Sequence, residues 1–467
     1  LAKYYFYETS VAQKLALLNN APVLQKLNVE DEIAHFEEKH NIQFHQEQKN
    51  AIINAINSGV CVITGGPGTG KTTIIKCIIE ILKAHNQKFM LLAPTGRAAK
   101  RMSDATGEEA KTIHRALEVA SGDLASISRF VYNENNTFKT NAVIVDEVSM
   151  VDAALMNHLC KALPRDCKLV LVGDKDQLPS VGAGNVLDDI IKSGIITVSM
   201  LTKIYRQSDK SLITENAHLI NNGKMPIINN ASSDFFFEEK EDLNDIKNSI
   251  VDMVARRLPK YTGLESSQIQ VLAPLKAGVC GIDNLNKCLQ QALNPPSTTK
   301  MELAVGETIF RVGDKVMQTA NNYNLVWKKQ TSFIEEEGEG VFNGDIGYIE
   351  LIDYQTGEVV VMFEDGRRCI FPRTEIGQLS LAYAITIHKS QGSEFDIVII
   401  PSIAGPNMIL TKNLIYTAVT RAKKMVVIVG EQKNLKRMVT NKYTAKRLTL
   451  LKDLLIEAEK KIKQLFD

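Results

Sequence analysis

The sequence predicts an α/β protein of several domains, in which short parallel strands alternate with helices. Four apolar runs each end in a turn rich in Gly, Pro or Asp and precede helix-forming sequence; they are Val60–Thr64, Phe89–Ala93, Ala142–Val145 and Leu169–Val172. This alternation is typical of a parallel sheet flanked by helices, with ligand groups at the carboxyl ends of the strands. A chain of 467 residues is long enough for about two to four domains, each with its own core.

Two segments in the first half of the chain depart from this alternation. Residues 1–40 are expected to be helical, because leucines form an apolar stripe that is interrupted only at 19–22, Asn-Asn-Ala-Pro. Between Ser121 and Thr140 a polar stretch predicts a small β-hairpin insert. A second α/β region opens near Leu201.

The second half of the chain contains an all-β segment. From 304 to 379, glycines separate short strands, which predicts a small β-barrel inserted in the second α/β region. Within it, the acidic run 334–340 is expected to be a mobile loop. The alternation of short strands and helices resumes at Leu381, and from Asn434 the sequence is helical and rich in Lys and Arg. We expect that last stretch to be a solvated helix face.

The charge balance excludes a uniformly basic protein that coats nucleic acid. Lys and Arg number 55 against 54 Asp and Glu, so the formal net charge is +1. Any nucleic-acid surface must then be a local channel rather than a field over the whole protein.

The sequence predicts neither a membrane span nor a secretory leader. No apolar run approaches about 18 residues, and no basic-then-apolar segment opens the chain. The chain begins at Leu1, which is compatible with a start inside a longer protein. Its seven cysteines are scattered and include no Cys-x-x-Cys pair. This pattern favours reduced thiols in a cytoplasmic protein over a disulfide framework, a zinc ribbon or an iron–sulfur cluster.

The strongest chemical signal is a glycine-rich loop at residues 65–72, Gly-Gly-Pro-Gly-Thr-Gly-Lys-Thr. It fits G-x-x-x-x-G-K-[ST], follows an apolar strand and opens a helix. Its glycines let the backbone turn successive N–H groups toward a phosphate, and the helix N-terminus adds positive charge. Lys71 can reach the β- and γ-phosphates of a nucleotide, and the Thr72 hydroxyl suits Mg²⁺. An ordinary glycine-rich turn is disfavoured by the strand–loop–helix context.

A second signal is the buried strand 143–145, which ends in Asp146 and Glu147. After a phosphate-binding loop, the first carboxylate is expected to hold Mg²⁺ and the second to polarise an attacking water. Two later arginines, Arg206 and Arg421, could neutralise charge on a departing phosphate. Taken alone, an acidic strand end and two surface or structural arginines remain open alternatives.

The ordered set of motifs resembles the superfamily 1 helicases, specifically the RecD-like DNA helicases of the 5′→3′ branch. In the first half of the chain, the similar segments are Gln48, 65–73, 93–99, 112–117, 146–150 and 173–179. In the second half, they are 205–207, 386–392 and 416–421. The match covers about residues 41–430, and independent chance matches in this order are not credible.

The resemblance implies two RecA-like P-loop domains with parallel sheets and ATP in the cleft between them. The implied division is a helical segment 1–40, a first domain 41–203 with a pin-like insert at 118–141, a second domain split into 204–303 and 380–467, and an SH3-like barrel at 304–379. The C-terminal helix falls in the last part of the second domain. Two departures from the family are a longer stretch at 324–340 and the lack of the helix-hairpin-helix region that often precedes the motor.

The resemblance also implies roles for individual residues. Those expected to act in hydrolysis are Lys71, Glu147, Gln177, Arg206 and Arg421. Mg²⁺ is expected at Thr72 and Asp146. Further ATP contacts are expected from Gln48, Gly66, Pro67, Gly68, Thr69, Gly70, Thr73, Tyr205 and Gly392. DNA contacts are expected from Pro94, Thr95, Gly96, Arg97, Thr112, His114, Thr386, His388 and Lys389.

The implied function is an ATP-dependent 5′→3′ helicase that moves on single-stranded DNA and opens forks in repair or recombination. Two other classes stay open: a motor subunit of an exodeoxyribonuclease V-type complex, and a P-loop kinase or nucleotide-gated binding module. Plain structural roles also stay open for three features. His388 could be a packed core histidine, Arg97 part of a solvated helix face, and the 118–141 insert a surface loop.

Overall fold

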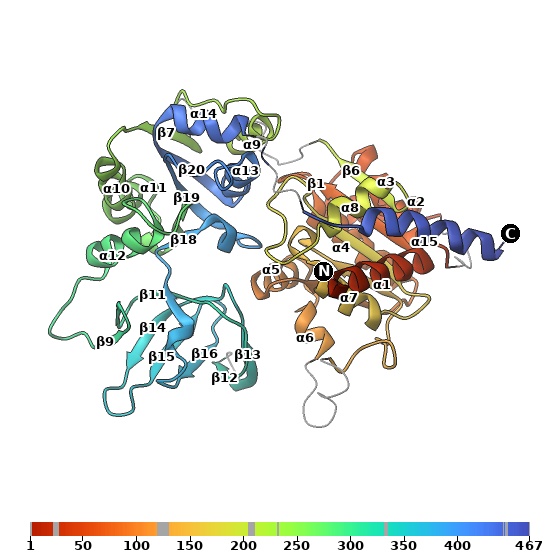
Figure 1. Ribbon diagram of the computed structural model, residues 1–467, viewed down its shortest axis with the longest axis horizontal. Helices are drawn as coiled ribbons and strands as arrows, with labels where there is room; N and C mark the ends of the chain where they lie inside the picture. Colours follow the sequence, from red (N-terminus) through yellow and green to blue (C-terminus); the bar gives the residue numbers. More distant parts are fainter. Residues whose placement is uncertain are drawn as a thin grey trace. The chain divides into compact units, whose positions relative to one another are not determined.

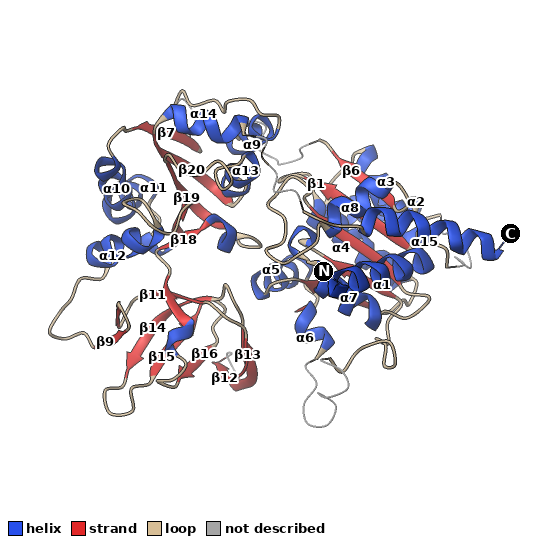
Figure 2. Cartoon of the chain, in the orientation of Figure 1, coloured by secondary structure: helices blue, strands red, loops and turns tan. Residues whose placement is uncertain are grey.

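The protein forms two compact units along one chain. The computed structural model describes residues 2–21, 28–118, 130–203, 211–230, 233–330, 335–441, 443 and 447–466. The first unit comprises Leu1–Asp209 together with Ala445–Asp467, and the second comprises Lys210–Thr444. Figure 1 follows the chain from red to blue, and Figure 2 shows the helices and strands of each unit. No helix among these described residues is long and apolar enough to cross a membrane.

The first unit is built on a parallel sheet of six strands in the order β3-β2-β4-β5-β1-β6. The strands are β1 Val60–Gly65, β2 Phe89–Ala93, β3 Ala110–Thr112, β4 Ala142–Val145, β5 Lys168–Gly173 and β6 Thr197–Leu201. β1 lies between β5 and β6, with Val60 paired to Leu169 and Cys61 to Thr197. The four strands expected from the sequence are therefore present as β1, β2, β4 and β5.

Helices cover both faces of this sheet, and β1 shows why its sequence is a continuous apolar run. Val60 and Val62 face a core that includes α1, α7, α8 and α15, whereas Cys61 and Ile63 face a core that includes α2, α3 and α4. A strand buried on both sides has no polar face to alternate with. The helices are α1 Ala2–Asn19, α2 Glu30–His40, α3 Gln46–Asn57, α4 Lys71–Ala84, α5 Gly96–Thr106, α6 Ile113–Leu117, η2 Val148–Met150, α7 Ala153–Ala162, α8 Val186–Ser193 and α15 Leu451–Phe466.

The C-terminal helix α15 belongs to the first unit, whereas the sequence-based division placed it with the second domain. Its expected solvated face is present, and on another face Leu451, Leu455, Ala458 and Ile462 are buried in the core that contains α1 and α8. Their spacing of three and four residues places them on one face of the helix. Lys452, Lys460, Lys461 and Lys463 are exposed and account for the solvated face that the sequence predicted.

The second unit contains a parallel sheet of five strands in the order β18-β8-β19-β20-β7. The strands are β7 Phe235–Glu239, β8 Ile269–Ala273, β18 Ala384–Thr386, β19 Phe395–Ser402 and β20 Ala422–Gly430. The helices are α9 Leu212–Asn221, α10 Leu243–Asp252, η3 Met253–Arg257, α11 Leu258–Thr262, η4 Ser266–Gln268, α12 Ile282–Leu293, η6 Ile387–Ser390, α13 Lys412–Val419 and α14 Gln432–Thr440. β18 and β19 come late in the sequence and flank the earlier β8, so the sheet closes only after the all-β segment has been completed.

The all-β segment forms a seven-stranded antiparallel sheet in the order β13-β12-β16-β15-β14-β11-β17, beside the pair β9 and β10. The elements are β9 Glu302–Val305, β10 Thr308–Arg311, β11 Lys315–Gln318, β12 Asn322–Gln330, β13 Glu335–Val341, β14 Ile346–Ile352, β15 Val359–Phe363, β16 Arg368–Phe371, η5 Ile376–Gln378 and β17 Leu379–Leu381. They enclose a core of their own that includes Phe310, Phe363 and Phe371.

The acidic run expected to be a mobile loop is instead strand β13, apart from residue 334, which lies outside the described residues. β13 pairs antiparallel with β12, and Lys328 lies opposite Glu337 while Lys329 lies opposite Glu336. Opposite charges across a strand pair are favourable, so lysines on β12 compensate the glutamates. Gly338 is required at its position because a Cβ there would lie 2.5 Å from the Trp327 ring.

The structure describes only the second half of the predicted pin, because residues 119–129 lie outside the described residues. Asn133 and Asn136 form an isolated antiparallel bridge that closes a tight turn. On either side, Phe130 and Phe138 are buried in the core of the first unit. These phenylalanines therefore anchor the insert, and strand separation by its remaining part stays a prediction.

Candidate functional site

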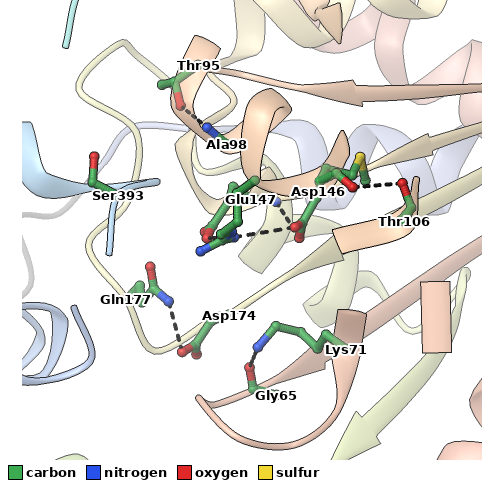
Figure 3. Close-up of polar contacts among 12 residues, drawn as sticks. Gly65, Lys71, Thr95, Ala98, Thr106, Asp146, Glu147, Asp174, Gln177 and Ser393 are labelled. Carbon is green, nitrogen blue, oxygen red and sulfur yellow. Dashed lines mark hydrogen bonds and ion pairs between the residues drawn. The ribbon is translucent and has the colours of Figure 1, made fainter. Parts of the chain in front are cut away.

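The glycine-rich loop connects β1 to α4 at the carboxyl edge of the first sheet. Gly68 and Gly70 have φ angles of 74° and 84°, in the left-handed region that favours glycine. The Nζ of Lys71 donates to the carbonyl oxygens of Gly65 and Gly66 at 2.6 and 2.9 Å. Figure 3 shows Lys71 turned toward Gly65. Thr69 closes the loop by donating from Oγ1 to the Gly66 carbonyl at 2.8 Å.

Gln48, expected to contact adenine, ties α3 to this loop. Its Oε1 accepts from the backbone N–H of His45 at 2.9 Å, and its Nε2 donates to the carbonyl of Thr69 at 3.0 Å. The side chain is buried, and a Cβ on Gly70 would lie 2.4 Å from its Nε2. Gln48 thus links the start of α3 to the glycine-rich loop, and its contact with a base stays a prediction.

Asp146 and Glu147 follow β4, next to the strands that carry the other site residues. Asp146 Oδ1 accepts from the Glu147 backbone N–H at 2.8 Å, and Glu147 has a left-handed φ of 53°. This backbone turn directs two consecutive carboxylates to the same edge of the sheet (Figure 3). Burial, and then the neighbouring carboxylate, raise the pKa of Asp146, while Arg101 acts in the opposite direction. Such a site favours a nearby positive charge.

Arg101 supplies a positive charge to both carboxylates and was missed by the sequence analysis. Its Nη2 lies 2.6 Å from Glu147 Oε1 and 3.5 Å from Asp146 Oδ2. The residue lies on α5, forty-five positions before Asp146 in the chain. Nothing in the local sequence marks it, because the contact depends on β2 and β4 being neighbours in the sheet.

Gln177 lies in the loop after β5, where its Nε2 donates to Asp174 Oδ2 at 3.2 Å (Figure 3). Both side chains are buried. The backbone N–H of Lys175 donates to Thr64 Oγ1 at 3.2 Å, which joins this loop to the end of β1. The loop is therefore held beside the glycine-rich loop, as the pairing of β5 with β1 requires.

A second residue that the sequence analysis missed, Arg447, holds the next part of the same loop. Its Nη1 donates to Ser180 Oγ at 3.2 Å and to the carbonyls of Gly182 and Gly184 at 2.9 and 2.6 Å. Its Nη2 donates to the Ser180 carbonyl at 2.5 Å. The C-terminal segment that leads into α15 thus reaches the loop that follows Gln177.

Two of the DNA-contact candidates in the first unit cap helices. Thr95 Oγ1 accepts from the backbone N–H of Ala98 at 3.3 Å and begins α5, directly after Pro94 and before Gly96 and Arg97. Thr112 Oγ1 accepts from the N–H of Arg115 at 3.0 Å and begins α6. The His114 ring, on α6, lies 6.2 Å from the Phe130 ring. Each cap fixes the start of a helix, and contact with DNA stays a prediction.

In the second unit, the residues of 386–392 form a tight turn after β18. Thr386 Oγ1 accepts from the backbone N–H of Lys389 at 3.3 Å, and Gly392 has a left-handed φ of 74°. His388 has an exposed surface, so it is not the packed core histidine that the sequence left open, although burial by neighbouring protein atoms still lowers the pKa of its ring. Burial, together with the nearby Lys276, lowers the pKa of Lys389.

Arg421 lies between α13 and β20 and is buried, with 3% of its surface exposed. Its Nη1 donates to the Ser393 carbonyl at 3.1 Å and its Nη2 to Thr420 Oγ1 at 3.3 Å. It is therefore not a surface arginine. Arg206 and Tyr205 lie outside the described residues.

Three protein-family models match successive parts of the chain. Residues 48–183 match an AAA domain, and residues 285–363 match the ATP-dependent RecD-like DNA helicase SH3 domain. Residues 381–429 match the UvrD-like helicase C-terminal domain. The three matches fall on the first sheet, the all-β segment with α12, and the last strands of the second sheet.

Two curated relatives give the same indication. The chain is 33% identical over 379 residues to the ATP-dependent RecD2 DNA helicase of Deinococcus radiodurans, an alignment that covers 81% of this chain and 48% of that protein. It is 28% identical over 433 residues to the RecBCD enzyme subunit RecD of Mycobacterium tuberculosis, covering 85% of this chain and 71% of that one. The chain therefore spans about half the length of the first relative.

A solved structure shares the fold. It is the Pif1 helicase from Bacteroides in complex with ADP-AlF3 and ssDNA, which is 18% identical to this chain with a TM-score of 0.50. The match covers 91% of this chain and 98% of that one.

Proposed function

The chain belongs to the RecD-like helicases, and on this premise we propose that it is an ATP-dependent 5′→3′ DNA helicase. It would bind and hydrolyse ATP with Mg²⁺, move along single-stranded DNA and separate duplex at forks in repair or recombination. Its seven cysteines are all free thiols, in keeping with a proposed cytoplasmic location.

The observation that carries this proposal is the grouping of three loops at one edge of one sheet. Lys71 follows β1, Glu147 follows β4 and Gln177 follows β5, and these strands are adjacent in the order β4-β5-β1. The carboxyl ends of neighbouring parallel strands are where α/β proteins bind nucleotides. A positive group, a carboxylate pair and an amide are thereby held around one position for a phosphate chain.

The residues present fit a nucleotide with a hard divalent cation. The Thr72 hydroxyl and the Asp146 carboxylate are oxygen donors of the kind Mg²⁺ prefers, and together they would hold it. When bound, the cation supplies charge that offsets the phosphate oxygens. Lys71 would turn from the loop carbonyls to the phosphates, Glu147 would orient and polarise the attacking water, and Gln177 would position the terminal phosphate. Thr73, Gly66 and the other loop residues would present backbone N–H groups.

Further groups, in the second unit and in the segment that precedes it, would respond to hydrolysis. Arg421, and by resemblance Arg206, would neutralise charge as the terminal phosphate leaves. Tyr205 and Gly392 would contact the nucleotide. Thr386, His388 and Lys389 would meet the DNA backbone, as Thr95 and Arg97 would in the first unit. Backbone contacts suit a motor because they tolerate every base sequence.

The test is ATP hydrolysis by the purified chain with and without single-stranded DNA, followed by unwinding of forks with a single free tail. We expect stimulation by DNA and unwinding of forks with a 5′ tail. If the rate of ATP hydrolysis were the same with and without single-stranded DNA, the proposed helicase activity would be rejected. Unwinding only from 3′ tails would reject the direction while leaving the motor intact.

A motor subunit of an exodeoxyribonuclease V-type complex is the second candidate. It is favoured by the RecD subunit of Mycobacterium tuberculosis, of which this chain covers 71%. An obligate subunit should hydrolyse ATP but unwind poorly alone. Robust unwinding by the purified chain would therefore exclude it.

A further inference from the structure

Arg101, on α5, contacts Asp146 and Glu147, the two acidic residues that follow β4. It lies 2.6 Å from Glu147 and 3.5 Å from Asp146, whose side chains are only 7% and 10% exposed. The arginine side chain itself is 30% exposed. Contacts between a guanidinium and a carboxylate at this distance are about twice as strong as neutral hydrogen bonds, and they fix the direction of the side chain.

This contact restrains the carboxylate that we propose for the attacking water. Oε1 of Glu147 accepts an N–H from Arg101 at 2.6 Å, so that oxygen is directed to the guanidinium. A carboxylate paired with a guanidinium is a weaker proton acceptor, because the contact stabilises its ionised form, so Glu147 acts best on water after its side chain has turned away. Because the Glu147 backbone is held at a φ of 53°, most of this turn must come from its side-chain torsions.

The same helix carries the predicted DNA contacts at its other end. α5 has 11 residues and begins at Gly96, next to its cap Thr95. Arg97 and Arg101 are four residues apart, so they lie on the same side of the helix. A helix of this length moves as one body. A displacement at its first turn is therefore transmitted to Arg101 one turn later.

We propose that Arg101 is a positioning residue that couples DNA contact to ATP hydrolysis, an inference that rests on the proposed function above. With α5 in the described position, Arg101 restrains Glu147 and hydrolysis is slow. Single-stranded DNA binds more tightly when α5 is displaced, and this displacement separates Arg101 from Glu147. Glu147 then turns to the attacking water. DNA can shift this equilibrium only by its difference in affinity for the two positions of α5.

The experiment is Arg101→Ala in steady-state hydrolysis of Mg²⁺-ATP by the whole chain, with and without saturating oligothymidylate. Without DNA, we expect kcat to rise about fivefold or more, the lower end of typical coupling between two sites. With DNA, kcat should stay within about twofold of the wild-type value, because the restraint is already released there. The ratio of kcat with DNA to kcat without DNA therefore falls, while the KM for ATP changes little.

A matched control is Arg165→Ala. Arg165 is an exposed arginine of the same unit in the turn before β5, at the end of that strand opposite the site. Its removal should leave the ratio at the wild-type value. Arg101→Lys keeps the charge but loses the planar guanidinium, so its ratio should lie between those of wild type and Arg101→Ala. Arg101→Met keeps the apolar stem and replaces the alanine variant if the latter melts at a lower temperature.

Two results would overturn the inference. Equal losses of kcat with and without DNA in Arg101→Ala would mean that Arg101 supports Glu147 rather than restrains it. An unchanged ratio would mean that the contact carries no coupling. Failure of the proposed function looks different: the wild-type chain would show no stimulation by DNA, which would remove the basis of the inference as well.

Discussion

Arg421 in the second unit lies in a predicted motif and Arg101 in the first unit lies two residues beyond one, and their charges meet different partners. Arg101 contacts two carboxylates. Arg421 is more deeply buried, and its guanidinium donates to a carbonyl and a hydroxyl. Among the described residues, its Nε has no hydrogen-bond partner. A guanidinium that donates to neutral groups can still attract another anion, whereas the charge of one paired with carboxylates is already balanced.

The difference teaches that two arginines in one chain can have opposite effects on the same reaction. Removing Arg421 should take away a charge that the reaction needs. Removing Arg101 should take away a restraint. Variants that change one residue at a time therefore test the comparison. The first is at Lys71, because the effects of Arg101 and Arg421 both require ATP hydrolysis.

The largest effect is expected from Lys71→Ala, which should abolish ATP hydrolysis with the fold intact. Lys71 donates to two carbonyls of its own loop and lies outside the apolar core, so its side chain is not needed for packing. The measurements are steady-state hydrolysis and a thermal melt without nucleotide. Near-normal turnover would reject the phosphate assignment, and with it any role for Arg101 or Arg421 in hydrolysis.

Arg421→Ala should reduce DNA-stimulated turnover by about 10³ while changing ATP affinity far less, because a finger acts mainly when charge develops in the transition state. Arg421→Lys keeps a charge but loses the planar fork, so it should recover only part of the rate. Turnover and fluorescent-nucleotide binding separate the two effects. Equal losses in both would show that Arg421 makes only ground-state contacts or supports the turn around Ser393, and the contrast with Arg101 would fail.

Glu147→Gln should keep ATP binding and cut turnover by about 10², the usual scale for losing a positioned proton acceptor. The same change removes the carboxylate that Arg101 contacts. In the double variant with Arg101→Ala, the gain of turnover without DNA should therefore vanish. A gain that persists without Glu147 would show that Arg101 acts through another group, such as Asp146.

Some of these features could be predicted from sequence and others could not, for physical reasons. The glycine-rich loop is local, because its residues are adjacent and their spacing alone specifies the turn. Asp146 and Glu147 could be found because an apolar strand precedes them. Arg101 could not, since its contact depends on which strands are neighbours. The acidic strand β13 was mistaken for a loop because the lysines that compensate it lie on β12.

The C-terminal helix shows the same limit on a larger scale. Its buried positions, such as Leu455 and Ile462, are spaced for a helix face, but the sequence gives no sign of which core they enter. The sequence-based division assigned this helix to the second domain because it follows that domain's last motif in the chain. The structure instead places α15 against α1 and α8, with Arg447 at the start of the returning segment.

The smallest effect is expected from Arg447→Ala, which tests a third arginine that, like Arg421, is held by neutral groups. Arg447 donates to carbonyls of Ser180, Gly182 and Gly184, and burial lowers its pKa. Losing a half-buried charged donor costs about 1.5–3 kcal/mol at most, so we expect a fall of a few degrees in melting temperature, at about 2–4 °C per kcal/mol for a unit of this size. Because this loop follows Gln177, turnover should fall severalfold with the KM for ATP little changed.

Arg447→Lys, which can reach one or two of the carbonyls, should lose less melting temperature and less turnover than Arg447→Ala. The exposed Arg165→Ala should leave melting temperature and turnover unchanged. A normal melt with normal turnover in Arg447→Ala would mean that the returning segment docks on α1 and α8 without positioning the loop.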